Sequence, residues 1–199
     1  MSVRDRVRVI EERLLSDNWY ILKTTHFEFR RGDGRWQAQH RETYDRGNGA
    51  AILLYSLPRR SVIMTRQFRY PAFVNHYDEL MIEVPAGLLD EADPETRIRT
   101  EAEEEAGYRV GKVRKVCEAF MSPGAVTERL HLFVAEYDPG DKVSDGGGLE
   151  QEGEDIEVFE LDFDEAMAMV ADGRICDAKT IMLLQYAALN LFSAAGIGA

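Results

Sequence analysis

The stretch "GLLDEADPETRIRTEAEEEAGYRV", residues 87–110, contains the clearest helix boundaries in the sequence. Asp93 is a good N-cap, and Pro94 suits the first helical position, where a missing N–H costs nothing. Gly107 suits the position just past the helix end, where left-handed backbone is common. The stretch therefore predicts a single helix between these residues.

Acidic side chains crowd one side of this helix. At about 100° per residue, Glu101 and Glu105 share a face and Glu104 lies beside them. Glu103 points to the opposite side. Like charges one turn apart repel, but carboxylates at this spacing suit a hard divalent cation, which they hold together with substrate phosphates. The face thus predicts a metal site, and an acidic surface that is merely solvated is the alternative.

The composition is that of a globular protein with one main domain. Of 199 residues, 45% are hydrophobic and 30% are charged, and no apolar run could span a bilayer. The formal net charge of -12 lacks the basic excess of nucleic-acid or membrane-surface binders, so we expect neither partner. Cys117 and Cys176 form no disulfide framework or zinc motif, and the start of the sequence does not resemble a secretion signal. These features favour a cytoplasmic protein.

Patterning along the chain predicts an α/β protein, a mixed-sheet α/β/α sandwich. Residues 5–15 have apolar side chains at helical spacing and are expected to form an amphipathic helix. Residues 18–31 and 35–47 alternate as two strands around a Gly-rich turn. We therefore expect an N-terminal helix and β-hairpin over residues 1–47 and the main domain over residues 48–199. Further strands are expected over residues 50–57, 61–70, 80–87, 112–121, 130–137 and 156–163, and further helices over 164–173 and 178–192.

The acidic helix and its flanks resemble the signature of the Nudix hydrolases, written Gly-x5-Glu-x7-Arg-Glu-U-x-Glu-Glu-x-Gly-U, where U is bulky and apolar. The matching residues are Gly87, Glu101, Ala102, Glu104, Glu105, Gly107 and Tyr108. The resemblance implies the Nudix fold, with divalent ions bound by Glu101 and Glu105. It also implies that Glu104 and Glu105 serve in catalysis and that the main-chain carbonyl of Ala86 joins the metal ligands.

Departures from this signature concern its loop and its arginine. The loop between the two halves is one residue short, and Asp93 stands where the pattern has Glu. Thr100 occupies the position of the Arg. Arg99 is adjacent but points away from the glutamates, whereas Arg97 lies on their face one turn earlier. We expect Arg97 to supply the missing orienting charge, with Arg99 as the alternative.

The resemblance extends over most of the chain, from about Ser16 to Leu189. The segments that carry it are "SDNWY", "YDRGNGAAILLY", "RQFRY", "PAGLLD", "FMSPGAVTE", "GGGLE" and "CDAKT". In this order they resemble the branch that hydrolyses nucleoside-diphosphate sugars, with the GDP-mannose hydrolases nearest and the ADP-ribose pyrophosphatases next. The likeness implies Mg²⁺ as the cofactor, with Mn²⁺ as a substitute, and a homodimer formed through the N-terminal hairpin.

The same likeness implies a set of substrate-binding residues, which are Trp19, His40, Arg41, Glu42, Arg69, Glu128 and Lys179. The planar guanidinium of Arg69, at a strand end, suits a diphosphate. Lys179 opposes the helix dipole at the start of the last helix, a conflict that a bound phosphate would offset. Trp19 as a base-stacking residue competes with an ordinary core aromatic, and Glu128 with a plain loop glutamate. The His40–Glu42 segment is expected to act from the partner subunit.

Residues 145–155 are too acidic and Gly-rich for a regular element and are expected to form a mobile loop. Glu152 and Glu154 resemble a piece of the ADP-ribose branch that delivers the general base and a metal ligand. We assign Glu152 as the base and Glu154 as the metal ligand, because a mobile loop activates water only after substrate closes the site. The alternatives are Glu154 or a helix carboxylate as the base, or a loop whose charges only aid solubility.

These expectations combine into the hydrolysis of a nucleotide sugar at its diphosphate, with GDP-mannose giving GMP and mannose 1-phosphate. ADP-ribose or another ADP-sugar is the alternative substrate, because Pro123 lies fifteen residues past Tyr108, a position associated in the family with ADP-sugar preference. A non-catalytic Nudix-fold nucleotide-binding module is the alternative from another class, and the retained helix glutamates argue against it. An acidic interaction domain would leave the ordered flanking motifs unexplained.

Overall fold

The structure is a computed structural model that describes residues 2–193, apart from the side chain of Glu152. The chain divides into two compact units. The N-terminal unit runs to Asn48 and includes Phe120–Arg129. The larger unit consists of Gly49–Ala119 and the chain from Leu130 onward. Each unit contains a sheet of its own.

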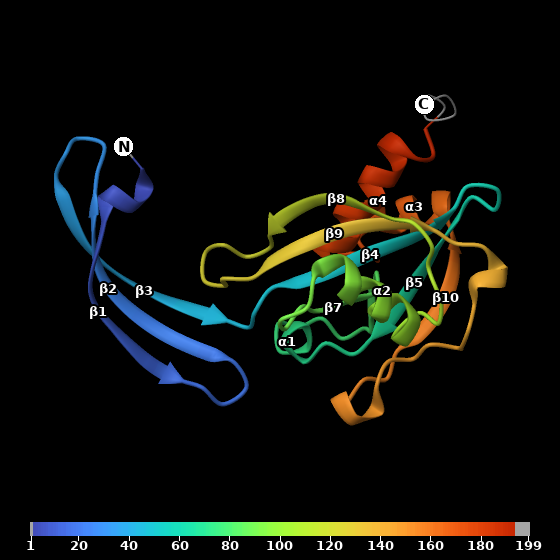
Figure 1. Cartoon of the computed structure of the whole chain (residues 1–199), viewed down its shortest axis with the longest axis horizontal. Helices are drawn as coiled ribbons and strands as arrows, with labels where there is room; N and C mark the ends of the chain where they lie inside the picture. Colours follow the sequence, from blue (N-terminus) through green and yellow to red (C-terminus); the bar gives the residue numbers. More distant parts are fainter. Residues whose placement is uncertain (1, 194–199) are drawn as a thin grey trace. The chain divides into compact units, whose positions relative to one another are not determined.

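The N-terminal unit is built on a three-stranded antiparallel sheet, coloured in blue tones in Figure 1. Its elements are the short 3-10 helix η1 (Val3–Arg6) and strands β1 (Val7–Ser16), β2 (Ile21–Arg30) and β3 (Trp36–Asp45). Strand β2 lies between β1 and β3. The two strands predicted around the Gly-rich turn are β2 and β3, so this hairpin is confirmed.

The helix predicted over residues 5–15 is wrong, because most of this segment is strand β1. β1 pairs with β2 and carries an irregularity between Val9 and Glu11. A β-bulge adds one residue to a strand and shifts the alternation of its two faces. Val7, Val9 and Leu14 thereby oppose residues that lie on the same face of β2.

The N-terminal unit lacks a core of its own. None of its described residues is fully buried. The large apolar side chains that β1 exposes are Val7, Val9, Ile10, Leu14 and Leu15. A sheet that buries so little apolar surface gains little from the hydrophobic effect. The three strands therefore leave most of the apolar side chains of β1 exposed.

The larger unit is built on a seven-stranded mixed sheet. Its strands are β4 (Gly49–Ser56), β5 (Ser61–Gln67), β6 (Met81–Glu83), β7 (Ala86–Leu88), β8 (Val113–Phe120), β9 (Arg129–Glu136) and β10 (Glu157–Asp162). The main order is β10-β5-β4-β9-β8, with β6 paired to β5 and β7 to β4. Strands β4 and β9 are parallel, whereas β4 and β5 are antiparallel. The predicted mixed sheet is confirmed.

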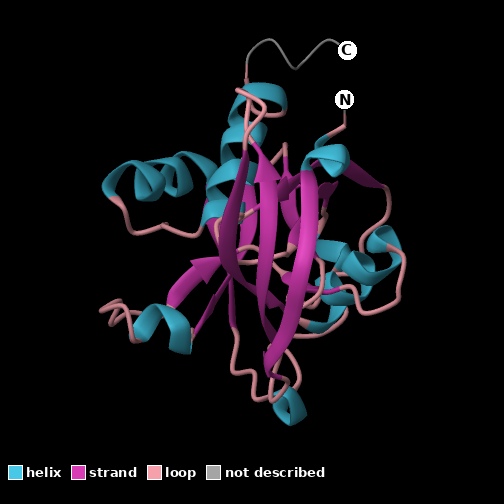
Figure 2. Cartoon of the chain, turned by 90° about the vertical axis from the view of Figure 1, so that its left-hand side faces the viewer, coloured by secondary structure: helices cyan, strands magenta, loops and turns pink. Residues whose placement is uncertain are grey.

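Strand β4 is buried on both faces and separates two helical layers. Ala50, Ile52 and Leu54 belong to the same core cluster as the apolar side of helix α2 (Pro94–Glu104). Figure 1 shows α2 in front of the sheet, with α3 (Phe163–Asp172) and α4 (Ala178–Asn190) behind it. This is the expected α/β/α sandwich. Figure 2 colours the helices cyan and the strands magenta in a view turned by 90°.

Helix α2 begins and ends where the sequence predicts. Asp93 accepts hydrogen bonds from the N–H groups of Glu95 and Thr96, and Pro94 is the first helical residue. Gly107 has a φ of 79°, just past the C-terminal end of the helix. Glycine adopts this left-handed conformation without strain, which explains why the helix stops here.

Shorter segments complete the larger unit. Tyr70–Phe73 forms a short helix, α1, where the sequence predicts the end of a strand, and Pro71 suits its first turn. The 3-10 helices η2 (Pro139–Asp141) and η3 (Glu150–Glu152) lie between β9 and β10. Within residues 2–193, no helix combines the length and the apolar character that crossing a membrane requires.

Candidate active site

Glycine at position 87 lets strand β7 pass directly against helix α2. A Cβ built on Gly87 would lie 2.9 Å from the Cγ of Glu101 and nearer still to the Glu101 carboxylate. Real Cβ atoms essentially never approach another atom within 3.0 Å. Glycine therefore leaves the space that the Glu101 carboxylate occupies. This explains why the signature begins with a glycine.

Glu105, one turn after Glu101, is buried, with 2% of its surface exposed. Its Oε2 accepts a hydrogen bond of 2.8 Å from the N–H of Ala86. Burial raises the pKa of Glu105 to about 8, the N–H of Ala86 opposes the rise, and the negative charges of Glu101 and Glu154 add to it. Burial is the main cause of this rise, so the site disfavours the ionised form of Glu105, and the neighbouring negative charges strengthen that effect.

Arg97 provides a positive charge that faces the helix glutamates, as the helical spacing predicts. Its Nη2 lies 2.6 Å from Glu101 Oε1, and its Nε donates to the carbonyl of Leu88 at 3.0 Å. Arg99 instead binds Glu95 at 2.8 Å, on the other side of the helix. Arg97 therefore contacts the glutamate that the missing signature arginine would be expected to orient.

The neighbouring helix residues have other partners. The Thr100 hydroxyl donates to the carbonyl of Thr96, one turn earlier, at 3.4 Å. Glu103 forms an ion pair of 2.8 Å with Arg109, away from the other glutamates. Glu104 is half-buried beside them. Its catalytic role remains a prediction.

The loop over residues 145–155 is fastened to the C-terminal end of α2. Gly147 donates its N–H to the carbonyl of Glu105 at 3.0 Å, and Gly148 donates to the carbonyl of Glu104 at 3.2 Å. Both glycines have a positive φ, which allows the turn that brings their N–H groups to the helix end. Two main-chain hydrogen bonds therefore hold this segment, for which the sequence predicts a mobile loop, against the end of α2.

Glu154 lies where this loop returns toward β10. Its carboxylate accepts the N–H of Leu149 at 2.9 Å, and its charge contributes to the raised pKa of Glu105. A Cβ on Gly148 would lie 2.8 Å from the Cβ of Glu154, so the glycine permits this close packing. The side chain of Glu152 lies outside the described part of the chain, so its assignment as the general base remains a prediction.

The chemistry of the donor set fits a hard divalent cation. Glu101 and Glu105 are buried one turn apart, and the Ala86 amide is hydrogen-bonded to Glu105. In the part of the chain that the structure describes, no three His, Cys, Asp or Glu side chains converge closely enough to hold a metal by themselves. Mg²⁺ is commonly held by one or two carboxylates together with substrate phosphates and water. The arrangement suits a cation that binds together with the substrate.

A cluster that the sequence does not predict lies next to these carboxylates. Glu83, at the end of β6, is 1% exposed and accepts hydrogen bonds from both Nε and Nη2 of Arg69, each at 2.8 Å. Lys179 Nζ donates to the same carboxylate at 2.7 Å and lies 3.1 Å from Asp177. The charge of Arg69 also lowers the pKa of Glu105. The signal for Glu83 in the sequence is an acid inside the apolar stretch "LMIEV".

Arg69 and Lys179 differ in what they leave for a substrate. The Arg69 side chain is 39% exposed, whereas that of Lys179 is 11% exposed. Lys179 is enclosed by two carboxylates, and Arg69 is held by one. Arg69 is therefore the better placed of the two to meet a diphosphate, and substrate contact by Lys179 remains a prediction.

The other predicted substrate residues belong to the N-terminal unit. Trp19 is 81% exposed, which excludes the alternative of a core aromatic. The three residues of the His40–Glu42 segment follow one another on β3 and are exposed. Glu128 is mostly buried and lies 3.5 Å from the Nε of Arg46. Their roles in binding substrate remain predictions.

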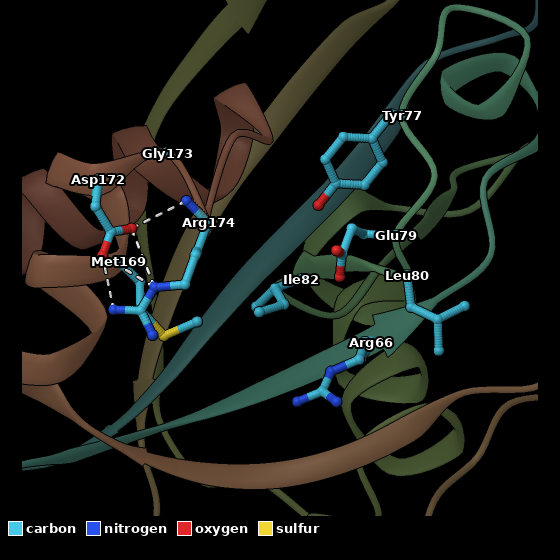
Figure 3. A pocket seen from close by; sticks show the side chains of 9 residues that line it. All are labelled: Arg66, Tyr77, Glu79, Leu80, Ile82, Met169, Asp172, Gly173 and Arg174. Atoms are coloured by element: carbon cyan, nitrogen blue, oxygen red, sulfur yellow. Dashed lines mark hydrogen bonds and ion pairs between the residues drawn. The ribbon is translucent and has the colours of Figure 1, made fainter.

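A hollow of about 640 Å³ opens in the larger unit (Figure 3). It is lined by Arg66, Tyr77, Glu79, Leu80, Ile82, Met169, Asp172, Gly173 and Arg174. Figure 3 shows Arg174 turned toward Asp172, with which it forms an ion pair of 2.7 Å. None of the predicted catalytic, metal-binding or substrate-binding residues lines this hollow. The candidate active site is therefore the carboxylate cluster with Arg69.

Comparison with known proteins identifies the family. Residues 6–44 match the family model described as the GDP-mannose pyrophosphatase NudK N-terminal domain. The chain is 53% identical over 191 residues to the GDP-mannose pyrophosphatase of Pectobacterium atrosepticum, covering 96% of this chain and 98% of that protein. The chain belongs to the GDP-mannose pyrophosphatase family of Nudix hydrolases.

Two other relatives within the GDP-mannose pyrophosphatase family agree. The protein of Klebsiella pneumoniae is 50% identical over 181 residues, covering 90% of each chain. The protein of Yersinia pestis is 51% identical over 193 residues, covering 96% of each chain. The predicted resemblance to Nudix hydrolases of nucleoside-diphosphate sugars is thus confirmed, and the family generally uses a divalent metal.

Proposed function

We propose that this protein hydrolyses GDP-mannose at its diphosphate, releasing GMP and mannose 1-phosphate. The observation that carries this proposal is an identity of half or more with GDP-mannose pyrophosphatases along nearly the whole chain. The likeness includes the N-terminal sheet, because residues 6–44 match the NudK N-terminal domain. Trp19 and the His40–Glu42 segment lie in this shared region.

The residues that would hold the divalent cation are Glu101, Glu105, Glu154 and the main-chain carbonyl of Ala86. We take the cation to be Mg²⁺, with Mn²⁺ as a substitute. When bound, such a cation neutralises diphosphate oxygens and lowers the pKa of a water molecule. Arg97, 2.6 Å from Glu101, would fix the direction of that carboxylate and so replace the arginine absent at Thr100.

A water molecule must lose a proton during hydrolysis, and a loop glutamate is the proposed acceptor. We assign this role to Glu152, in the short helix η3. Hydrogen bonds from Gly147 and Gly148 fasten the loop to the end of α2, which supports its delivery of an acid to the helix glutamates. Glu104 is the proposed neighbouring catalytic carboxylate, and Glu154 is the alternative base.

The diphosphate requires cationic contacts, and Arg69 is the first of them. Its guanidinium is partly exposed and interacts electrostatically with Glu105. Lys179 and Glu128 are the further substrate contacts expected from the family resemblance. The base and sugar would be bound by the exposed Trp19 and by His40–Glu42, the latter from a partner subunit.

The active unit is proposed to be a homodimer formed through the N-terminal sheet. This sheet has no fully buried described residue and exposes Val9, Ile10 and Leu14 on β1 at 63%, 56% and 52%. Apolar side chains exposed to this degree on one strand favour contact with another surface. A second copy of the chain would supply the cover that the sheet lacks and bring His40–Glu42 to the other subunit's site.

A cytoplasmic location is also proposed. Cys117 and Cys176 are both free thiols, and Cys176 is exposed. Free thiols persist in reducing compartments, where disulfides seldom form. This supports the expectation from the sequence.

ADP-ribose or another ADP-sugar is the alternative substrate. The spacing of Pro123 from Tyr108 and the Glu152–Glu154 loop favour it. The same carboxylates would act on either diphosphate, because the difference concerns the base and the sugar. A non-catalytic nucleotide-binding module is a weaker alternative, since both helix glutamates are in place.

The test is a panel of GDP-mannose, ADP-ribose and ADP-glucose, each assayed with Mg²⁺, with Mn²⁺ and with EDTA. Chromatography of the products separates GMP and mannose 1-phosphate from GDP and mannose. We expect the highest kcat/KM with GDP-mannose and no turnover in EDTA. A higher kcat/KM with ADP-ribose would support the alternative. Absence of EDTA-sensitive turnover on all three would refute the hydrolase proposal.

A further inference from the structure

Glu83 is a buried carboxylate that binds two cationic side chains and has no role in the proposed hydrolysis so far. Arg69 reaches it from the segment after β5, and Lys179 reaches it from the first turn of α4. Burial acts to raise the pKa of Glu83, but the charges of Lys179 and Arg69 outweigh it and lower the pKa to about 2. The carboxylate is therefore ionised at neutral pH and attracts both cations.

The hydrogen bonds to Glu83 determine which edge of Arg69 is available. A guanidinium has five N–H donors in one plane. Glu83 takes one donor from Nε and one from Nη2, so the outer edge consists of Nη1 and the second donor of Nη2. Two parallel donors of this kind match the oxygens of a phosphate. Because the Arg69 side chain is 39% exposed, this edge can be reached by a ligand.

Lys179 connects the same carboxylate to helix α4. Asp177 caps α4 by accepting hydrogen bonds from the N–H of Thr180 at 3.0 Å and from its hydroxyl at 2.6 Å. The Thr180 hydroxyl oxygen accepts the N–H of Val84 at 3.0 Å. Val84 follows Glu83 directly, so the start of α4 and the end of β6 are joined at two adjacent residues. Glu83 is thereby fixed from both sides.

We propose that Glu83 is a positioning residue, which holds the guanidinium of Arg69 so that its outer edge meets a phosphate of the substrate. Lys179 in turn holds Glu83 in place. This inference rests on the proposed hydrolysis of GDP-mannose. An arginine without such an anchor has several rotamers available, and ordering it on binding reduces the affinity for the ligand. Loss of Glu83 therefore weakens substrate binding through Arg69.

Two variants test this role. Glu83→Gln keeps the shape and removes the charge, whereas Glu83→Asp keeps the charge and shortens the side chain by one methylene group. With GDP-mannose and Mg²⁺, we expect KM to rise roughly 10- to 100-fold and kcat to change by less than about threefold, as for a lost charge-assisted hydrogen bond. Glu83→Gln leaves Arg69 and the buried Lys179 with one carboxylate fewer and can fail to fold. Glu83→Asp then carries the test.

Arg69→Ala tests whether Glu83 acts through Arg69. The double variant Glu83→Asp with Arg69→Ala is expected to raise KM no further than Arg69→Ala alone, because the group that Glu83 positions is absent. Effects of the two substitutions that multiply would overturn the inference. A Glu83→Asp variant with the KM of the wild type would overturn it as well.

Glu160→Gln is the matched control. Glu160 accepts the same pair of hydrogen bonds from Arg59, at 2.7 and 2.8 Å, outside the candidate site. We expect it to keep the KM of the wild type, and an equal rise in KM would overturn the specific role of Glu83. Binding and turnover of GDP-mannose by the wild type, measured with Mg²⁺ in the same series, separate the two proposals. A wild type that neither binds nor hydrolyses GDP-mannose refutes the proposed function and this inference together, whereas wild-type turnover with unaltered Glu83 variants refutes this inference alone.

Discussion

Replacing Gly87 by alanine is expected to disable the candidate active site while the protein still folds. The added Cβ would lie 2.9 Å from the Glu101 Cγ and nearer still to its carboxylate, whereas ordinary contact begins at 3.4 Å. The carboxylate must therefore move by roughly 1 Å or more, and a displacement of that size at a reacting centre can cost about 100-fold in rate. The fold itself should lose only about 1–3 kcal/mol, as for other cases of overpacking.

The assay for Gly87→Ala is kcat/KM on GDP-mannose with saturating Mg²⁺, together with a thermal melt. We expect kcat/KM to fall about 100-fold and the variant to melt cooperatively. Gly111→Ala is the matched control, because a Cβ on Gly111 meets no atom within 4 Å, and its activity should equal that of the wild type. A Gly87→Ala protein with at least a third of the wild-type kcat/KM would refute the claim that this glycine exists to admit Glu101.

Three further predictions concern charge and the N-terminal sheet. Arg97→Ala should lower kcat/KM and weaken Mg²⁺ binding about tenfold, because its ion pair with Glu101 is lost. Arg99→Ala should change neither quantity. Equal effects of the two variants in a paired assay would contradict the assignment of Arg97 as the residue that orients Glu101. The hydrogen bond from Arg59 lowers the pKa of Glu160 to about 2. The ionised carboxylate therefore stabilises the fold at pH values above its ordinary pKa of 4.5, and this contribution is lost as the pH falls toward 2. Melts over this interval should therefore show a shallower loss of Tm for Glu160→Gln than for the wild type. If the proposed homodimer forms through β1, Val9→Lys should give a monomer in light scattering where the wild type gives a dimer. A Val9→Lys variant with the mass of the wild type would exclude β1 from the proposed interface.

Helix α2 could be predicted because its signals are local. Asp93, Pro94 and Gly107 act on backbone groups within a few residues, and the structure confirms all three. The contact between Arg97 and Glu101 is also local, since both positions lie one turn apart on the same face. The positions of the helix glutamates and of Arg97 on one face could therefore be predicted from the sequence without the rest of the fold.

Features that depend on partners distant in the chain could not be predicted from the sequence. The faces of β1 alternate correctly only when its bulge against β2 is known, so the apolar pattern of residues 5–15 was consistent with a helix. Glu83 has one partner 14 residues away and another 96 residues away. Neither spacing follows from a helix or strand period. A single acidic residue in an apolar strand indicates a buried polar contact, but the partner cannot be identified from the sequence alone.

The cluster around Glu83 determines where the charge for binding a diphosphate must come from. Arg69 and Lys179 contribute two formal positive charges, and Glu83 and Asp177 cancel them. The pKa of Glu105 nearby is raised first by burial and further by the negative charges of Glu101 and Glu154, so its surroundings offer no surplus positive charge. Arg69 can orient a phosphate with its outer edge, but this balanced cluster cannot neutralise one. Neutralisation of the diphosphate therefore requires a divalent cation. We expect no turnover in the absence of that cation. A site with free basic groups would keep part of its activity in chelator, and this arrangement predicts none.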